Sequence, residues 1–378
     1  MSRTLPDRAK LAFRIFSTRD EDAHQWHQSF DPLRWQDKDV FFGIEYARAY
    51  ERSQRYEVFL ASYTEGSGRI LMPFALRDLR RLPFMARAGV DGPIYDMTSL
   101  YPFGGPIALL RSEEASEQLH HNFHKSLAQY CTTNRVVAQF TAFHPLLENH
   151  RRLQATGLAK IECRKEVVWI DLDKDESTLF REMSSNHRRA VSRARRCGVV
   201  IEHHLPDSAR LAEFTVLYRE MVRRVGADER WNFPDAYFEQ CAGCLGSDHV
   251  TVFNARRGFE TIASALVLHD NETAYYHLCG GSRESARNFR PNHLLIFELA
   301  LWAKTRGCRR LFLGGGSQPN DGLFRFKVGF SNSRSWLYTS NVVYDQQLYR
   351  RVCEAREAWD KERGIEPPST DFFPAYRV

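Results

Sequence analysis

The stretch at residues 273–330 constrains the fold of this chain more than any other. It begins with TAYYHLCGG at residues 273–281, which is rich in strand-forming residues. Apolar residues at helical spacing follow at 292–304, and a second strand-like run at 309–313 leads into three glycines. The stretch closes with a loop that ends in FRFKVGF at 324–330. This order of strand, helix, strand and glycine turn predicts a βαβ unit that binds a substrate.

The length of 378 residues predicts two domains, or one domain built of two halves. A step from helix to strand at residues 127–140 is repeated at 301–313, which suggests two copies of one α/β unit. A strand-like run at 165–172 marks the entry into the second half. We therefore expect an α/β fold with mixed sheets and two domains, at residues 1–165 and 166–378. The second should end in a closing helix over 346–363.

Composition limits the cellular setting. No run approaches the ~18 apolar residues of a membrane span, and the N-terminus lacks the apolar core of a signal peptide. Eight scattered cysteines suit a reducing compartment, so we expect a cytoplasmic protein without integral membrane contact. Cys241 and Cys244 are the one close pair. Without a second pair at metal spacing, they are better explained as core residues of a helix than as metal ligands.

Several common catalytic motifs are missing. The chain has no H-E-x-x-H, no P-loop, no G-x-G-x-x-G and no G-x-S-x-G. Hydrolase, kinase and dehydrogenase functions therefore have no motif to support them. The two histidine pairs, at 120–121 and 203–204, lie in patterns typical of partly exposed surface.

Lys327 is the most informative single residue. Only nine of the 53 basic residues are lysines, and this one lies between Phe326 and Val328, shortly after a glycine turn. A partly desolvated ammonium there could hold an oxyanion or a phosphate. It could equally be a lysine whose aliphatic stem covers an amphipathic edge. Gly314–Gly316 likewise offers backbone that a substrate can approach, or an ordinary turn.

A helix expected over residues 177–196 carries many arginines. They recur at three- and four-residue steps along one face, with apolar residues between them: Arg181, Arg188, Arg189, Arg195 and Arg196. Cations without interleaved carboxylates repel one another unless anions neutralise them. The face is either a ridge that contacts phosphates or a solvated surface.

The motifs together resemble those of the Fem-type peptidyltransferases and the related double acetyltransferase-like (GNAT) proteins. The resemblance rests on Tyr275-Tyr-His, the helix from Asn292, Gly314-Gly-Gly and Phe326-Lys-Val-Gly-Phe330. It also takes in the basic helix, Tyr101-Pro-Phe-Gly-Gly-Pro106 and Phe143-His-Pro145. Residues 40–345 are covered, most specifically by the F-K-x-G-F ending.

This resemblance implies two tandem GNAT-like lobes packed together. It implies transfer of an aminoacyl group from aminoacyl-tRNA to an amine of a peptide, natural-product or cell-envelope precursor, without a cofactor or metal. Phe326 and Lys327 match the Phe-Lys pair of the family, in which the lysine stabilises the oxyanion. The same resemblance, with the chemistry above, suggests these substrate-binding residues: Tyr276, His277, Asn292, Gly315, Arg188, Arg189 and Tyr101. The long coiled-coil insertion of the larger cell-wall members is missing, and the N-terminal half matches loosely.

Two other functions remain open. An N-acyltransferase could take its acyl group from coenzyme A or an acyl-carrier protein, but the turn at 287–292, RNFRPN, lacks the glycines of a usual pyrophosphate-binding loop. A non-enzymatic nucleic-acid-binding protein could use the arginine face, but that function leaves Lys327 unexplained.

Overall fold

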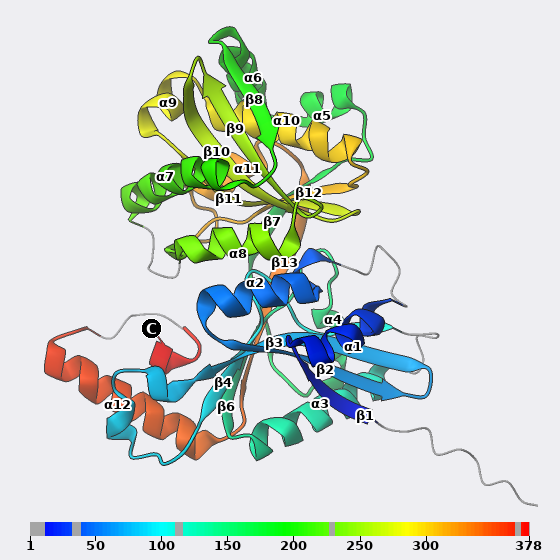
Figure 1. Cartoon of the computed structure of the whole chain (residues 1–378), viewed down its shortest axis with the longest axis vertical. Coiled ribbons are helices and arrows are strands. Elements are labelled where there is room, and N and C mark those ends of the chain that lie inside the picture. Colours follow the sequence, from blue (N-terminus) through cyan, green and yellow to red (C-terminus); the bar gives the residue numbers. More distant parts are fainter. Residues whose placement is uncertain (1–11, 32–38, 110–115, 227–230, 367–371, 378) are drawn as a thin grey trace, which may run out of the picture. The chain divides into compact units, whose positions relative to one another are not determined.

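The computed structural model describes residues 12–31, 39–109, 116–226, 231–366 and 372–377, which form two compact units (Figure 1). The first unit comprises Met1–Leu33, Arg55–Arg164 and Leu337–Val378, and the second comprises Arg34–Gln54 and Lys165–Trp336. A boundary near residue 165 thus separates most of the first unit from most of the second. Two segments lie on the other side of this boundary: residues 34–54 belong to the second unit, and residues 337–378 belong to the first.

The first unit is a mixed sheet covered by helices. Its strands follow the order β1-β2-β3-β4-β6-β13, and only β4 and β6 among these neighbours run parallel. The strands are β1 Ala12–Ser17, β2 Glu57–Glu65, β3 Gly68–Asp78, β4 Tyr95–Thr98, β5 Ile107–Leu109, β6 Val136–Ala142 and β13 Ser333–Val343. The helices are α1 Asp20–Phe30, α3 Ser116–Thr133, α4 His150–Thr156 and α12 Gln346–Arg363. Met72 and Phe74 of β3 pack with Phe123 of α3, whereas Val137 of β6 packs with Val352 of α12.

The strands of the second unit follow the order β7-β12-β11-β10-β9-β8. Its strands are β7 Ile161–Asp171, β8 Val199–His204, β9 Val250–Arg257, β10 Glu260–His269, β11 Thr273–Gly281 and β12 Arg310–Gly314. Its helices are α2 Ile44–Gln54, α5 Glu176–Glu182, α6 Ser185–Arg196, α7 Ser208–Val225, α8 Asp235–Leu245, α9 Arg283–Asn288, α10 Pro291–Thr305 and α11 Gly322–Val328. Strands β11 and β12 are parallel and the other neighbours antiparallel. Parallel strands need a crossover, which α10 supplies, so the predicted βαβ unit is present.

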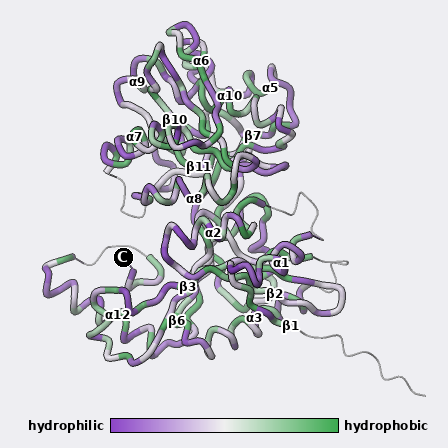
Figure 2. The backbone as a smooth tube through the Cα atoms, in the orientation of Figure 1, coloured by the Kyte–Doolittle hydropathy of each residue, from purple (hydrophilic) through white to green (hydrophobic). Residues whose placement is uncertain are grey.

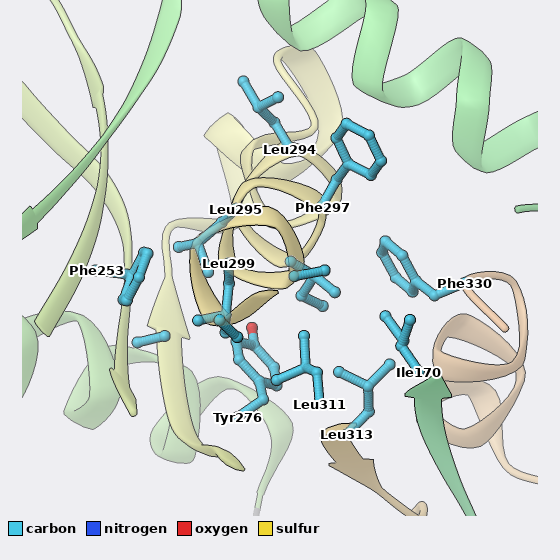
Figure 3. Packing of buried hydrophobic residues seen from close by; sticks show 14 of the residues in the cluster. Ile170, Phe253, Tyr276, Leu294, Leu295, Phe297, Leu299, Leu311, Leu313 and Phe330 are labelled. Atoms are coloured by element: carbon cyan, nitrogen blue, oxygen red, sulfur yellow. The ribbon is translucent and has the colours of Figure 1, made fainter. Parts of the chain in front are cut away.

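Helix α10 lies at the centre of the second unit's core. Figure 3 shows Leu295 and Leu299 of this helix beside Tyr276 and Leu311 of the sheet, all of them buried. The helix is apolar on nearly every side, as expected of one enclosed in a core. Strand β10 is buried along most of its length for the same reason, and Figure 2 shows hydrophobic residues along it.

The arginine-rich segment is two helices, so the prediction of one helix over 177–196 is wrong. Helix α5 ends at Glu182, and Met183 and Ser184 are extended before α6 begins. The Ser184 side chain accepts a hydrogen bond from the His187 N–H and caps α6, as Asp175 caps α5. A second capping residue in the middle of the segment therefore starts a new helix.

Three further sequence expectations can be compared with the structure. FRFKVGF at 324–330 was expected in a loop, but residues up to Val328 form the helix α11. His120 is almost fully buried on α3, so its expected surface position is wrong, whereas His203 is exposed and His204 half-buried. Cys241 and Cys244 lie in α8, where Cys241 is buried. Among the described residues, no helix has both the length and the apolar character needed to cross a membrane.

A buried acidic cluster joins residues 39–42 to the sheet of the second unit. The Tyr275 hydroxyl donates to Asp39, and the Val40 N–H donates to Asp270 Oδ2 at 3.2 Å. The other carboxylate oxygen of Asp270 accepts from the Glu272 and Thr273 N–H groups at 2.8 and 2.7 Å. Burial, with the nearby Asp39 carboxylate, raises the pKa of Asp270 to about 7.

This cluster predicts a pH dependence of stability. Because the pKa of Asp270 is higher in the folded chain than its usual 3.8, the folded chain binds more protons between pH 4 and pH 7. The free energy of unfolding should therefore fall as the pH rises through this range, on the order of 1–3 kcal/mol from this group. Asp270→Asn should flatten that fall, measured by urea unfolding from pH 5 to pH 8. The control Asp173→Asn, at an exposed carboxylate whose pKa is lowered, should keep the wild-type slope, and an unchanged slope in Asp270→Asn would refute this account.

A second stability prediction concerns Gly280, where β11 meets α7. A Cβ atom at this position would lie 2.4 Å from the backbone of Leu217 and of Tyr218. Because backbone atoms in a packed helix cannot yield locally, Gly280→Ala should lower the free energy of unfolding by about 2 kcal/mol or more. The control Gly243→Ala lies in α8 with nothing outside its own helix within 4 Å. It should gain roughly 0.5–1 kcal/mol, so equal urea midpoints for the two variants would contradict the packing argument.

Candidate active site

The candidate site begins where two parallel strands stop pairing. Strands β11 and β12 pair only over Thr273–Tyr275 and Arg310–Phe312. Beyond Tyr275, β11 pairs with β10 alone, and a β-bulge leaves His277 without a residue opposite it. Beyond Phe312, β12 leads into the glycines and pairs with β7. Among the described residues, no ladder joins the carboxyl ends of these two strands. Bulges of this kind often re-aim side chains beside functional sites.

The side chain of Lys327 contacts the glycine turn at the end of β12. It lies in the last turn of α11, is half-buried, and its Nζ donates to the carbonyl oxygen of Gly315 at 2.8 Å. Burial, with the nearby Lys165 ammonium, lowers the pKa of Lys327 to about 8. The side chain therefore remains mainly protonated at pH 7. It is a fixed cation whose ammonium is held by the backbone.

The three glycines are required by the chain's own packing. A Cβ at Gly315 would lie 2.9 Å from the Glu166 carbonyl oxygen, and one at Gly316 only 2.1 Å from Asp321 Oδ1. Gly314 has a φ of +77°, which disfavours other residues, and a Cβ there would lie 3.5 Å from Lys327 Nζ. The neighbours of the turn thus occupy the space that side chains at these three positions would need, and substrate contact at Gly315 remains a prediction.

Asp321 fixes the segment between the glycines and α11. Its Oδ2 accepts from the N–H groups of Ser317 and Gln318 at 2.7 and 3.0 Å, and its Oδ1 accepts from the Phe324 N–H at 2.7 Å. These bonds cap α11 and lower the pKa of Asp321. The carboxylate is therefore ionised and bound to backbone N–H groups. These bonds fix the position of the glycine turn relative to α11, which carries Lys327.

Lys165 is a second lysine on the same turn, and it is not among the site residues predicted from the sequence. Its Nζ donates to the Gly316 carbonyl oxygen at 2.5 Å, so two ammoniums bind consecutive carbonyls. Cys279, on β11, is close enough to Lys327 for their charges to interact, and burial raises the pKa of its thiol. The scarcity of lysine applies equally to all nine lysines, so it could not distinguish Lys165 from the others.

Phe326 lies in an aromatic cluster next to Lys327. Its ring centroid lies 5.5 Å from that of His187, 5.0 Å from that of His293 and 5.2 Å from that of Phe330. His187 Nε2 also lies 2.8 Å from the Phe326 carbonyl oxygen, and a Cβ at Gly329 would overlap the His187 ring. Burial lowers the pKa of His293 to about 4, so this imidazole is neutral. In this arrangement Phe326 anchors α11 to α6 and α10.

Tyr276 and His277 have different surroundings, although they are consecutive. Tyr276 is buried in the core between the sheet and α10 (Figure 3). His277 Nε2 lies 2.8 Å from the Tyr237 hydroxyl, which lies 2.9 Å from the Tyr46 hydroxyl. Burial lowers the pKa of His277 to about 3, so it is a neutral hydrogen-bonding group. Contact with a substrate remains a prediction for both residues.

Arg188 and Arg189 behave differently on α6. The Arg188 guanidinium donates to the carbonyl oxygens of Arg181 and Met183, at 2.8 and 2.5 Å, and so bridges the break between α5 and α6. Arg189 is exposed and donates to Asn186 Oδ1 at 2.6 Å. Arg189, Arg193 and Arg196 are exposed on this helix. The cationic face is thus narrower than predicted, because Arg188 is occupied with backbone.

Asn292 and Tyr101 complete the predicted set. Asn292 lies in the first turn of α10 after Arg290, whose φ is +57°, and Pro291. Its buried Oδ1 has no hydrogen-bond partner among the described residues. Tyr101 belongs to the first unit, in the segment between β4 and β5. The second unit therefore brings together Lys327, Phe326 and Gly315, and a substrate-binding role for Tyr101 remains a prediction.

Comparison with known proteins identifies the fold. A family model described as an acetyltransferase (GNAT) domain matches residues 181–327, from the end of α5 to Lys327 itself. No curated protein matches the chain by sequence.

Solved structures extend the likeness to both units. A crystal structure of FemX is 13% identical, with a TM-score of 0.63, over 84% of this chain and 96% of that one. A conserved protein of unknown function from Bacteroides thetaiotaomicron VPI-5482 is 10% identical, with a TM-score of 0.55, over 88% of this chain and 100% of that one. The mixed α/β fold and the resemblance noted in the sequence are confirmed. The chain therefore has the Fem-type, double GNAT-like fold, and its residues 181–327 match the acetyltransferase (GNAT) domain model.

Proposed function

We propose that this protein is an amide-forming aminoacyltransferase, which moves an aminoacyl group from aminoacyl-tRNA to an amine of a peptide, natural-product or cell-envelope precursor. One observation carries the proposal above all. Lys327 presents an ammonium, held by the Gly315 carbonyl oxygen, beside the place where β11 and β12 stop pairing. A preorganised cation of this kind can stabilise the oxyanion of acyl transfer without reorganising during the reaction.

The reaction needs no covalent intermediate on the protein. The acceptor amine attacks the ester carbonyl carbon, a C–N bond forms, and the carbonyl oxygen becomes an oxyanion that Lys327 stabilises. The C–O bond to the ribose then breaks, and the proton lost by the amine ends on the ribose hydroxyl. Holding the amine and the ester together lowers the entropic part of the barrier.

The exposed arginines of α6 support a nucleic-acid donor. Arg189, Arg193 and Arg196 lie on one short helix whose first turn contains no acidic residue. Guanidinium groups bind phosphates in a planar, two-pronged geometry. Arg195 is excluded because it pairs with Glu298 at 2.8 Å. Arg189, Arg193 and Arg196 are therefore the candidates for tRNA contact.

A donor thioester of coenzyme A or an acyl-carrier protein is the second candidate function. The observation that favours it is the match to a GNAT acetyltransferase model. Against it, the turn before α10 contains Arg290 and Pro291 where a pyrophosphate loop would expose glycine N–H groups. Proline also removes one N–H from the first turn of that helix.

Lys327→Met should lower kcat for aminoacyl transfer by about 10²–10³-fold with little change in KM, because the cation acts on charge that develops during the reaction. The measurement is steady-state transfer from a charged tRNA pool to added amines. In the unchanged protein, activity should also fall above about pH 8, as Lys327 loses its proton.

Lys304→Met is the matched control for this experiment. Lys304 also donates to a main-chain carbonyl, that of Leu172 at 2.8 Å, but it lies at the end of α10. It should retain full activity. A Lys327→Met protein that turns over at the wild-type rate would refute the proposed role of the ammonium.

Replacing Arg189, Arg193 and Arg196 together by Gln should weaken tRNA binding and lower its salt dependence. Each lost phosphate contact reduces the slope of log K against log salt by roughly 0.7–0.9. Filter binding of tRNA between low and moderate salt measures both quantities.

The control removes the same charge from the first unit, at Arg80, Arg151 and Arg350, which are also exposed. A general electrostatic attraction would weaken equally in both triple variants. If the arginines of α6 contact tRNA, the loss of tRNA affinity must be larger in the α6 variant than in the control. Equal losses would refute that contact.

A further inference from the structure

The start of α6 is hydrogen-bonded to the end of α11. His187 Nε2 lies 2.8 Å from the Phe326 carbonyl oxygen. The Ser184 N–H donates to the Gly329 carbonyl oxygen at 2.9 Å. Carbonyl groups at the end of a helix lack their regular partner within that helix, and these two bonds supply partners from α6. Lys327 lies between the two bonded carbonyl groups in the sequence.

The tautomer of His187 follows from its partners. Burial lowers the pKa of His187 below its usual 6.5, so the imidazole is neutral at pH 7 and carries one N–H. Because the Phe326 carbonyl oxygen can only accept, this N–H is at Nε2. Nδ1 is then an acceptor, and the Ser184 hydroxyl, at 2.9 Å, donates to it. The ring is therefore oriented by hydrogen bonds at both nitrogens.

The His187 ring also packs closely against the end of α11. A Cβ at Gly329 would overlap this ring, so the glycine permits the close approach. The ring centroid lies 4.6 Å from that of Phe330 and 4.7 Å from that of His293 on α10, edge to face in both pairs. Hydrogen bonds and packing thus hold the imidazole in one position.

Helix α11 depends on such contacts because it is short. Of its seven residues only Phe324 is buried, and isolated helices of this length are marginal in water. Asp321 fixes the start of the helix, whereas His187 fixes its end. Lys327 lies in the last turn, so the position of its ammonium at the Gly315 carbonyl oxygen depends on the contact with α6.

We propose that His187 is a positioning residue for Lys327, which fixes the ammonium relative to α6, the helix proposed to contact tRNA. The role in transfer rests on the function proposed above, whereas the positioning of the ammonium does not. Helix α6 carries the exposed Arg189, Arg193 and Arg196. A donor whose phosphates bind these arginines therefore meets an ammonium at a fixed distance from them, which preserves the geometry that acyl transfer requires.

The first experiment measures the reactivity of Lys327 towards an acetylating reagent as a function of pH, by mass spectrometry of the full-length protein without tRNA. His187→Phe keeps an aromatic ring but cannot donate to the Phe326 carbonyl oxygen. The end of α11 should loosen, and the ammonium should become less buried. The pH of half-maximal reactivity should therefore rise from about 8 towards the ordinary lysine value of 10.5.

Two variants control this measurement. The titratable groups whose charges act on Lys327 are unchanged in all variants: Lys165, Asp321 and Cys279. His187→Gln places an amide N–H where it can donate to the same carbonyl oxygen, so it should restore most of the wild-type profile. The matched control is His249→Phe, because His249 Nδ1 also lies 2.9 Å from a main-chain carbonyl oxygen, that of His269. It should leave the reactivity of Lys327 unchanged.

A further variant keeps the test decisive if His187→Phe does not fold. Ser184→Gly removes the hydroxyl that orients the imidazole but keeps the N–H that bonds to Gly329, and glycine costs little at a helix N-cap. It should move the Lys327 profile in the same direction by a smaller amount. An unchanged profile in His187→Phe, or in Ser184→Gly where the first variant does not fold, would overturn the proposal. An equal shift in His249→Phe would overturn it too.

Transfer assays test the link to the proposed function. His187→Phe should lower kcat about tenfold, the upper range for one lost hydrogen bond, and leave the KM for aminoacyl-tRNA unchanged. A shifted Lys327 profile in a protein that transfers nothing from aminoacyl-tRNA would support the positioning role and refute the proposed function. A lower kcat with an unchanged Lys327 profile would support the function and refute the positioning role.

Discussion

The short ladder between β11 and β12 is the constraint on which the site depends. Both strands continue past the last paired residues, Tyr275 and Phe312, so their carboxyl ends are free of each other. The bulge at His277 redirects β11, and the left-handed conformation of Gly314 redirects β12. Neither strand therefore continues as a regular strand. A regular parallel sheet would have closed this region with hydrogen bonds. Because it stays open, the turn at Gly314–Gly316 can accept side chains from β7 and α11.

Backbone carbonyl oxygens orient both lysines of the site. Lys327 Nζ donates to the Gly315 carbonyl oxygen at 2.8 Å, and Lys165 Nζ donates to the Gly316 carbonyl oxygen at 2.5 Å. Asp321 contributes indirectly, because it fixes the turn that carries those carbonyl groups. The glycines serve this packing, which explains why the turn contains three of them.

The sequence predicts the parts of this site that are periodic or local. Residues 273–313 combine two strand-like runs with one helical pattern, and the βαβ unit is confirmed. The contribution of Lys165 was not predictable, because it lies 151 residues from Gly316 and only the sheet brings them together. Residues 39–42 also contact a strand far along the chain, because Asp39 accepts a hydrogen bond from Tyr275 of β11. The remaining differences come from local helix capping. Ser184 starts a helix where the apolar pattern predicted that one helix continues, and Asp321 starts a helix where a loop was predicted.

The lowered pKa of Lys327 also bears on the proposed reaction. A cation whose pKa is about 8 keeps its proton at pH 7 with a small margin, because burial and the Lys165 ammonium both favour the neutral form. In the proposed transfer, the oxyanion that develops on the carbonyl oxygen would favour the protonated form of Lys327 and raise its pKa. The charge would therefore be held most firmly in the transition state, where it is used.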